Sequence, residues 1–203
     1  MPAADLVVLA ADGNIKTAVE GILTRHAALG IRKAAATFYV HPERDPGCLL
    51  RSDSFLRQHA GHFRHALVVF DREGCGNRAP AAELGLCVES KLAAAGWGQR
   101  AAAIVCDPEV DRWVWSTSPH VEDKLGWKGR SPALRDWLLS QQFPDDAEGK
   151  PARPKEALQA ALRVARKPRS SSIDGELARS VSFQTCKDAA FMKLIERLRV
   201  WFP

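Results

Sequence analysis

The chain has 203 residues, of which 46% are hydrophobic and 26% are charged, and its formal net charge is +5. This composition is typical of a globular domain and argues against intrinsic disorder. No apolar run approaches the ~18 residues that a membrane span needs, and the N-terminus lacks the basic flank and cleavage site of a signal peptide. We therefore expect a cytoplasmic protein that does not enter a membrane.

Positive charge is concentrated in one segment. Between Lys150 and Arg169 there are seven basic residues and one acidic residue, which leaves the remainder of the chain at a net charge of −1. Such a segment favours an anionic partner, although a solvated helix face explains it equally well. The five cysteines include no C-x-x-C pair, which argues against a disulfide framework and against a structural zinc site.

The first half of the chain alternates between short apolar runs and helical periodicity. Strands are expected at 5–11, 37–40, 66–70 and 101–106. Helices are expected at 15–23 with a stop at Gly30, at 53–60 and at 80–96, and 41–47 is typical of a turn. This alternation predicts an α/β fold with a parallel, Rossmann-like sheet flanked by helices.

After residue 107 the pattern changes, because no further strand is indicated. Helices are expected around 109–116, 132–139, 154–165 and 189–202, with loops at 145–154 and 170–172. The sequence therefore predicts an α/β core over 1–116 and a helical C-terminal subdomain over 117–203. The subdomain contains the basic segment 150–169.

Acidic residues follow the expected strands where each one ends. Asp12 follows the first strand, Asp71 and Glu73 the third, and Asp107 and Glu109 the fourth. Parallel strands share one carboxyl edge, where open α/β sheets bind their ligands, and carboxylates gathered there need a compensating cation. Oxygen ligands suit Mg²⁺ or Mn²⁺ rather than zinc. Capping and turn formation are the alternatives; capping is favoured for Asp107 and Glu109, whose part in the metal site stays open, and Asp12 fits either role.

Two of these motifs resemble those of a known family. Asp12 and Gly13 after the first strand, with the acid-x-acid pair Asp71 and Glu73 after a later one, resemble the Toprim fold of topoisomerases, primases and overcoming-lysogenization-type nucleases. The chain is also similar to Toprim-like proteins of bacterial methylation-associated anti-phage defence systems, most closely to their fourth component. The stretches that carry this likeness are 39–51, 66–76, 107–127 and 150–158.

The resemblance implies metal-assisted hydrolysis of DNA or RNA phosphodiesters. Asp71 and Glu73 would hold Mg²⁺ or Mn²⁺, with Asp12 as a third ligand or as the base that orients water. His41 is a candidate general acid, although a structural role is favoured for it. The chain departs from the family pattern in two places, since Asp12 replaces the usual glutamate and Glu73 the usual aspartate. Glu20 is another acid, but it lies well inside the first expected helix.

Basic residues near the expected site and in the helical part are candidates for phosphate contacts. They are Arg44, Arg72, Arg78, Lys128, Arg130, Arg163 and Arg166. Trp127, beside two of them, is a candidate for stacking on a nucleic-acid base.

Three functions compete at this point. The first is a Toprim-like, metal-dependent nuclease within an anti-phage defence system. The second is a non-catalytic subunit of the same system that binds nucleic acid or partner proteins, and the departures from the family motif favour it. The third is a doubly wound protein that binds a small phosphorylated ligand. Nucleic acid and other defence-system proteins are the expected partners, and a homo-oligomer is compatible with all three.

Overall fold

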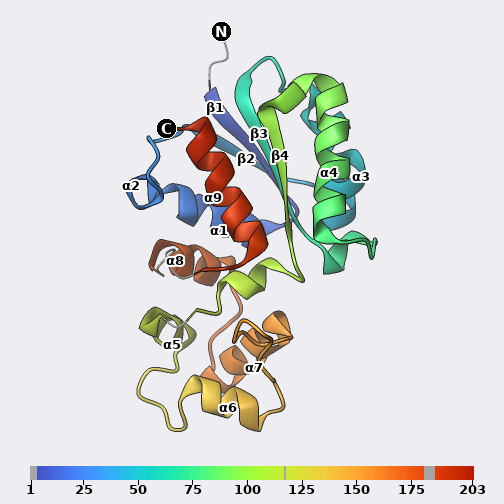
Figure 1. Ribbon diagram of the computed structural model, residues 1–203. Helices are drawn as coiled ribbons and strands as arrows, with labels where there is room; N and C mark the ends of the chain where they lie inside the picture. Colours follow the sequence, from blue (N-terminus) through green and yellow to red (C-terminus); the bar gives the residue numbers. More distant parts are fainter. Residues whose placement is uncertain (1–3, 117, 181–185) are drawn as a thin grey trace.

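A computed structural model of the protein describes residues 4–116, 118–180 and 186–203. Its strands form one parallel sheet in the order β2-β1-β3-β4 (Figure 1). The strands are β1 (Ala4–Ala10), β2 (Ala36–Val40), β3 (Phe63–Asp71) and β4 (Ala101–Cys106). The four predicted strands and the parallel α/β fold are therefore confirmed.

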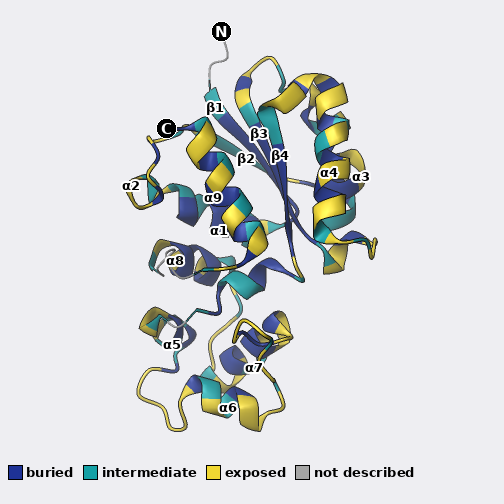
Figure 2. Cartoon of the chain, viewed as in Figure 1, coloured by how far each residue is buried: buried dark blue, intermediate teal, exposed yellow. Residues whose placement is uncertain are grey.

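The described residues also form helices, which lie on both faces of the sheet and beyond its carboxyl edge (Figure 1). They are α1 (Gly13–Leu23), α2 (His26–Leu29), α3 (Arg44–Arg57), α4 (Ala81–Leu92), α5 (Pro119–Leu125), α6 (Leu134–Ser140), α7 (Pro154–Ala165), α8 (Ser171–Ser180) and α9 (Ala189–Trp201), with shorter helical turns η1 (Glu73–Cys75), η2 (Ala93–Trp97), η3 (Gly98–Arg100) and η4 (Val110–Trp113). Helices α1 and α9 lie on one face and α3 and α4 on the other (Figure 1). The strands between them are largely buried, except for β2 at the edge (Figure 2).

The central strand β1 shows why its sequence lacks polar alternation. Val8 pairs with Phe38 of β2 on one side and with Leu67 of β3 on the other, and all three belong to the main hydrophobic cluster or pack against it. Helices on both faces leave no strand face for polar residues, so a parallel strand becomes a continuous apolar run.

The segment predicted as a turn at 41–47 instead begins helix α3. The predicted start at residue 53 was wrong by nine residues, since α3 begins at Arg44. Pro46 is tolerated in the first helical turn because its missing N–H would have no partner there. Gly47 is required by close approach, since a Cβ atom at this position would lie 2.0 Å from Nδ1 of His41.

Other helical predictions also differ from the structure. The helix expected over 109–116 is only the short turn η4, because its side chains are held by separate tertiary partners: Asp111 by Arg169, and Trp113 by Asp188. Helices α5 and α8 were not predicted. Within α8 lies Gly175, whose carbonyl oxygen would be 2.7 Å from a Cβ atom at Gly21, so the two glycines let α1 and α8 pack closely.

The helical C-terminal part consists of two groups. Helix α9 joins the cluster of the sheet through Phe191, Leu194 and Leu198. A second cluster includes Trp115, Trp127 and residues of α5, α6 and α7, and it lies beyond the carboxyl edge of the sheet (Figure 1). The predicted division at residue 117 into two subdomains stays a prediction. No helix in the described ranges combines the length and apolar character needed to cross a membrane.

Candidate functional site

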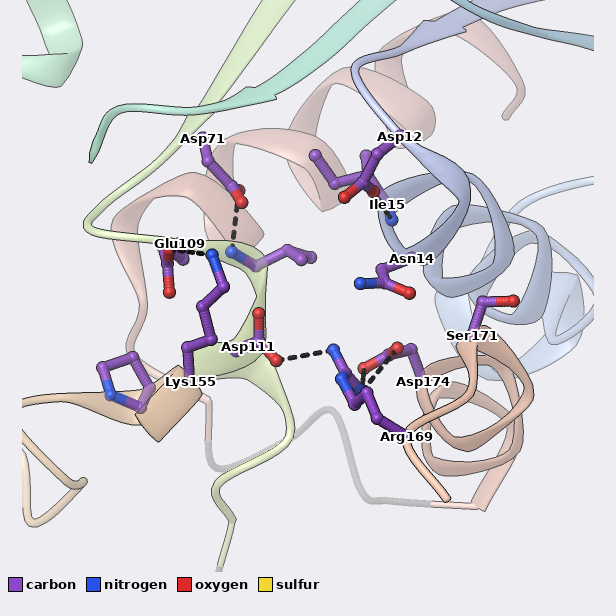
Figure 3. A network of polar contacts seen from close by, with 12 residues as sticks. Asp12, Asn14, Ile15, Asp71, Glu109, Asp111, Lys155, Arg169, Ser171 and Asp174 are labelled. Atoms are coloured by element: carbon purple, nitrogen blue, oxygen red, sulfur yellow. Dashed lines mark hydrogen bonds and ion pairs between the residues drawn. The ribbon is translucent and has the colours of Figure 1, made fainter. Parts of the chain in front are cut away.

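The strand order places the topological switch point of the sheet between the carboxyl ends of β1 and β3. We call this part of the carboxyl edge, which includes Asp12, Asp45 and Asp71, the crevice. The chain leaves β1 toward β2 on one side of the sheet, and it leaves β3 toward β4 on the other side. In doubly wound sheets, ligands bind where the connections diverge in this way. Asp12 follows β1 and Asp71 is the last residue of β3, so both predicted acids lie at this point (Figure 3).

Asp71 is the most buried of the predicted acids, with an exposed fraction of 8%. Its Oδ1 accepts a hydrogen bond of 2.8 Å from the backbone N–H of Val110. Its Oδ2 accepts none from any described residue, and it is not among the enclosed unpaired atoms, so it is accessible to solvent. Burial, followed by the nearby charge of Asp45, raises the pKa of Asp71 well above its usual value.

Asp45, in the first turn of α3, was missed by sequence reasoning. Its Oδ1 accepts a hydrogen bond of 2.8 Å from the backbone N–H of Asp71, and its Oδ2 lies against Gly74. Burial and the charge of Asp12 raise the pKa of Asp45, and the hydrogen bond from Asp71 opposes this only in part. Its position after β2 resembles the position of Asp12 after β1, so the sequence did indicate an acid at this edge. The prediction of a turn over 41–47 led to its omission.

Asp12 caps helix α1, as the alternative interpretation held. Its Oδ1 accepts a hydrogen bond of 2.9 Å from the N–H of Ile15. It also lies close enough to the other acids for its charge to raise the pKa values of Asp45, Asp111 and Asp174. Asp12 therefore both caps α1 and belongs to the acidic crevice.

Glu73 does not join Asp71 in a metal cage. It lies exposed in η1, and its charge acts on Glu109, whose pKa is raised mainly by burial. Across 4–116, 118–180 and 186–203, no group of three or more His, Cys, Asp or Glu side chains is arranged to hold a metal ion. The predicted set of Asp12, Asp71 and Glu73 is thus not preassembled in this structure.

Acids from the segment after β4 are neutralised by the helical part of the chain. Nζ of Lys155 lies 2.8 Å from Oε1 of Glu109, and Nη2 of Arg169 lies 2.7 Å from Oδ1 of Asp111 (Figure 3). Arg169 also binds Asp174 of α8, with Nη1 3.0 Å from Oδ2. Both cations belong to the basic segment 150–169, and nothing in its sequence pattern showed which acids they would meet.

Asp107 has a different role from its neighbour Glu109. It is exposed, and its Oδ1 accepts a hydrogen bond of 2.7 Å from Nε of Arg72. This pairing partly occupies Arg72 and orients it along the edge of the sheet. Arg44 and Arg78 are exposed and form no ion pair with a described residue, so both remain available to an anion.

His41 is buried, with an exposed fraction of 4%. Its Nδ1 accepts a hydrogen bond of 3.1 Å from the N–H of Glu43, and its ring packs against Phe55. Burial lowers the pKa of His41, so the ring is neutral near pH 7. This environment matches the favoured structural role, although the ring also lines a pocket beside Asp12 and Arg44.

Four predicted phosphate-binding residues gather around the C-terminal end of α7. Nη1 of Arg130 reaches the carbonyl oxygen of Val164 at 3.5 Å, next to Arg163, and Arg166 ends the helix. Lys128 lies two residues before Arg130, and all four basic residues are exposed. We call this group, Lys128, Arg130, Arg163 and Arg166, the distal basic surface.

Trp127 is not available for stacking on a base. It is only 3% exposed, its Nε1 donates to the carbonyl oxygen of Pro132, and its ring lies 4.7 Å from that of Trp137. The candidate role for this residue was therefore wrong, because the second hydrophobic cluster encloses the indole.

The donor chemistry of the crevice fits Mg²⁺ or Mn²⁺. Asp45 and Asp71 supply oxygen atoms only, and Asp12 is a further acid nearby. Burial raises the pKa values of both, and a neighbouring acid adds to each rise, Asp12 for Asp45 and Asp45 for Asp71. Magnesium commonly uses one or two carboxylates and keeps several water ligands, so it does not require a closed protein cage. Asp45 and Asp71 are the residues that would hold the ion.

Comparison with known proteins gives no relative: neither a family model, nor a curated protein, nor a solved structure matches this chain. Its class is defined by its own architecture, a doubly wound α/β protein with an acidic crevice at the switch point. The Toprim resemblance stays an expectation, and the function below is argued from the geometry.

Proposed function

We propose that the protein is a divalent-metal-dependent nuclease whose active site is the crevice between β1 and β3. The observation that carries this proposal is the pair of carboxyl groups of Asp45 and Asp71. Asp71 is buried and Asp45 is half-buried, and the backbone N–H of Asp71 donates to Oδ1 of Asp45. Burial raises the pKa of both, and the charge of Asp45 raises that of Asp71 further. Carboxylates held this way repel one another unless a cation lies between them.

A bound Mg²⁺ or Mn²⁺ would supply Lewis-acid activation of a phosphodiester and a water of lowered pKa. Asp45 and Asp71 are the residues that would hold it. Asp12 accepts the proton of the attacking water as the new P–O bond forms, while the leaving oxygen takes a proton from solvent as its bond to phosphorus breaks. Lys155, whose charge also acts on Asp71 and Asp111, is placed to stabilise negative charge developing on the phosphate.

The distal basic surface supports nucleic acid as the substrate class. Arg166 and Arg169 are three residues apart, so their Cα atoms are separated by at most about 11 Å. Because Arg169 binds Asp111 in the crevice, the surface begins close to the proposed active site. Exposed guanidinium and ammonium groups contact phosphates without reading sequence, which suits a nuclease of broad specificity.

A role in anti-phage defence, in a complex with other defence-system proteins, rests on the sequence resemblance alone. We keep it as the cellular part of the proposal. It is compatible with a cytoplasmic protein whose substrate is invading or cellular nucleic acid.

A specific observation favours the second candidate, a non-catalytic subunit that binds nucleic acid or a partner protein. Glu109, Asp111 and Asp174 already have cationic partners in Lys155 and Arg169. For these three acids, charge compensation does not require a metal ion. The two candidates differ in whether Asp45 and Asp71 bind a cation.

The deciding experiment incubates the purified protein with labelled single-stranded DNA, duplex DNA and RNA, with Mg²⁺, Mn²⁺ or EDTA. Asp71→Asn is the test variant. Glu83→Gln is its matched control, since it removes the same charge from an exposed position on α4. Metal-dependent cleavage by wild type and Glu83→Gln, lost in Asp71→Asn, is the expected result. Absence of cleavage by all folded forms, with nucleic-acid binding retained, would establish the non-catalytic subunit instead.

A further inference from the structure

A hollow lies beside Asp12, between the carboxyl ends of β1 and β2. It has a volume of about 430 Å³ and opens to solvent. Besides Asp12 it is lined by Gly13 and Asn14 of α1, by His41, and by Arg44 of α3. The crevice proposed for the metal lies toward β3, so this hollow is a separate place on the same edge of the sheet.

The first backbone N–H groups of α1 face no internal acceptor. Asp12 caps only Ile15, and the N–H of Lys16 already binds the carbonyl oxygen of Asp12. The N–H groups of Gly13 and Asn14 donate to no described residue. Nothing lies within 4 Å of a Cβ atom built on Gly13, so an anion can approach this turn freely.

His41 provides an independent indication of a ligand. Its side chain is more than nine-tenths buried, and Nδ1 is used as an acceptor from Glu43, which leaves the ring proton on Nε2. Nε2 donates to no described residue, yet it is not an enclosed atom, and His41 is among the residues that line the hollow. A buried side chain with an unpaired, accessible donor therefore belongs to the wall of this space.

Arg44 adds a positive charge at the rim. It is exposed, it has no ion-pair partner among the described residues, and its φ of 52° lies in the left-handed region. Asp12 also lines the hollow, so one carboxylate and one guanidinium group contribute opposite charges to it. This balance favours a singly charged ligand over a doubly charged one.

From these contacts we propose that the hollow is a phosphodiester-binding subsite, formed by the N-terminus of α1, Nε2 of His41 and Arg44. Within the proposed nuclease, on which this assignment of the ligand rests, it takes the backbone phosphate next to the one that is cleaved. His41 is then a binding residue that donates a hydrogen bond, and the substrate crosses the carboxyl edge from the β2 side.

The test uses the full-length, ¹⁵N-labelled protein in EDTA, so that it does not depend on metal or on cleavage. Thymidylyl-thymidine is the phosphodiester probe, and thymidine 5′-monophosphate represents a small doubly charged phosphate. We expect the dinucleotide to shift the amide signals of Gly13 and Asn14 at millimolar concentration, and to bind at least threefold more tightly than the monophosphate. Unchanged amide signals, or preference for the monophosphate, would overturn the proposal.

Two variants remove donors while preserving the fold. Gly13→Pro deletes one N–H at the first helical position, where proline is favoured and where the preceding Asp12 is extended with a φ of −150°. Arg44→Gly removes the cation and suits the positive φ. Each should weaken dinucleotide binding about fivefold or more, while Arg44→Lys and the exposed control Arg57→Gln should not. Asp71→Asn should retain binding, which separates failure of this subsite from failure of the nuclease.

Discussion

Nζ of Lys155 lies 2.8 Å from Oε1 of Glu109, although the two residues are 46 positions apart. Lys155 belongs to the first turn of α7, and Glu109 follows β4. The contact therefore joins the helical part of the chain to the carboxyl edge of the sheet. Since Glu109 is only 7% exposed, it depends on this partner for most of its charge compensation.

Replacing Lys155 should destabilise the protein. Lys155→Met leaves a buried carboxylate unpaired, which costs about 2 kcal/mol of unfolding free energy. The cost is smaller than for a fully buried ion pair because the lysine side chain is 49% exposed. Adding Glu109→Gln should recover most of the loss. Urea unfolding measures both, with Lys33→Met as an exposed control. Equal stability of Lys155→Met and wild type would contradict the prediction.

Stability should rise on mild acidification. Burial, opposed by Arg169, raises the pKa of Asp174 to about 6. The folded protein then binds this proton more tightly than the unfolded chain, so the penalty present above pH 6 disappears as the pH falls toward 4. Its full size is on the order of 3 kcal/mol. The raised pKa values of Asp45, Asp71, Glu109 and Asp111 act in the same direction.

Unfolding free energies measured between pH 7.5 and 4.5 check this expectation. Asp174→Asn should be less dependent on pH than wild type over that range. Below about pH 4 the trend should reverse, because Arg32 lowers the pKa of Asp5 to about 2 and this pairing is lost on protonation. A steady decline of wild-type stability from pH 7.5 to 5.5 is the result that would refute the argument.

Metal binding should be visible without any substrate. If Mn²⁺ binds the crevice with a Kd of ~1 mM, then 10 mM stabilises the fold by about 1.4 kcal/mol, or a few degrees in Tm. Asp71→Asn should abolish this shift and Glu83→Gln should keep it. Differential scanning fluorimetry in Mn²⁺, Mg²⁺ and EDTA makes the comparison. A shift that persists in Asp71→Asn would locate the ion elsewhere.

The distal basic surface should govern the salt dependence of nucleic-acid binding. Replacing Arg163 by Gln and Arg166 by Gly removes two charges, and glycine suits the φ of 56° at the end of α7. The slope of log K against log salt should fall by roughly 1.8 for duplex DNA. Fluorescence anisotropy at several salt concentrations measures it. An unchanged slope, equal to that of Arg57→Gln, would remove the surface from the binding site.

Asp188 should be critical for docking α9 on the sheet. Its Oδ1 caps the helix through the N–H of Phe191 and also accepts from Nε1 of Trp113, while Oδ2 lies 3.2 Å from Nε of Arg112. Asp188→Ala should cost about 3 kcal/mol, from the lost cap and the unpaired donors. Asp188→Asn keeps the cap and should cost less. Chemical unfolding gives both values, and equal costs would show that the cap contributes little.

The fold was predictable to the extent that its signals are local. The central parts of β1, β3 and β4 are continuous apolar runs because helices cover both faces, and such runs are recognisable in any single sequence. The start of α3 was not recognisable. The turn-like composition at Pro46 and Gly47 is helical in the structure, where Gly47 packs closely against the ring of His41.

The candidate site divides in the same way. Asp12 and Asp71 were found because they follow strands, and parallel strands must bring their carboxyl ends to one edge. Asp45 was missed along with the start of α3. Glu73 was paired with Asp71 from a spacing of two residues, but the turn η1 leaves it exposed beside Glu109.

By itself the sequence determined the parallel α/β architecture and the acidic edge, since both follow from hydrophobic periodicity and the direction of the strands. Only the tertiary structure decided which charges meet. Lys155 and Arg169 belong to a segment whose composition is typical of a solvated basic surface. In the structure, however, Lys155 pairs with Glu109 and Arg169 with Asp111. The reason is physical: such contacts depend on how α7 and α8 pack beyond the sheet, and that packing is set by residues distant in sequence.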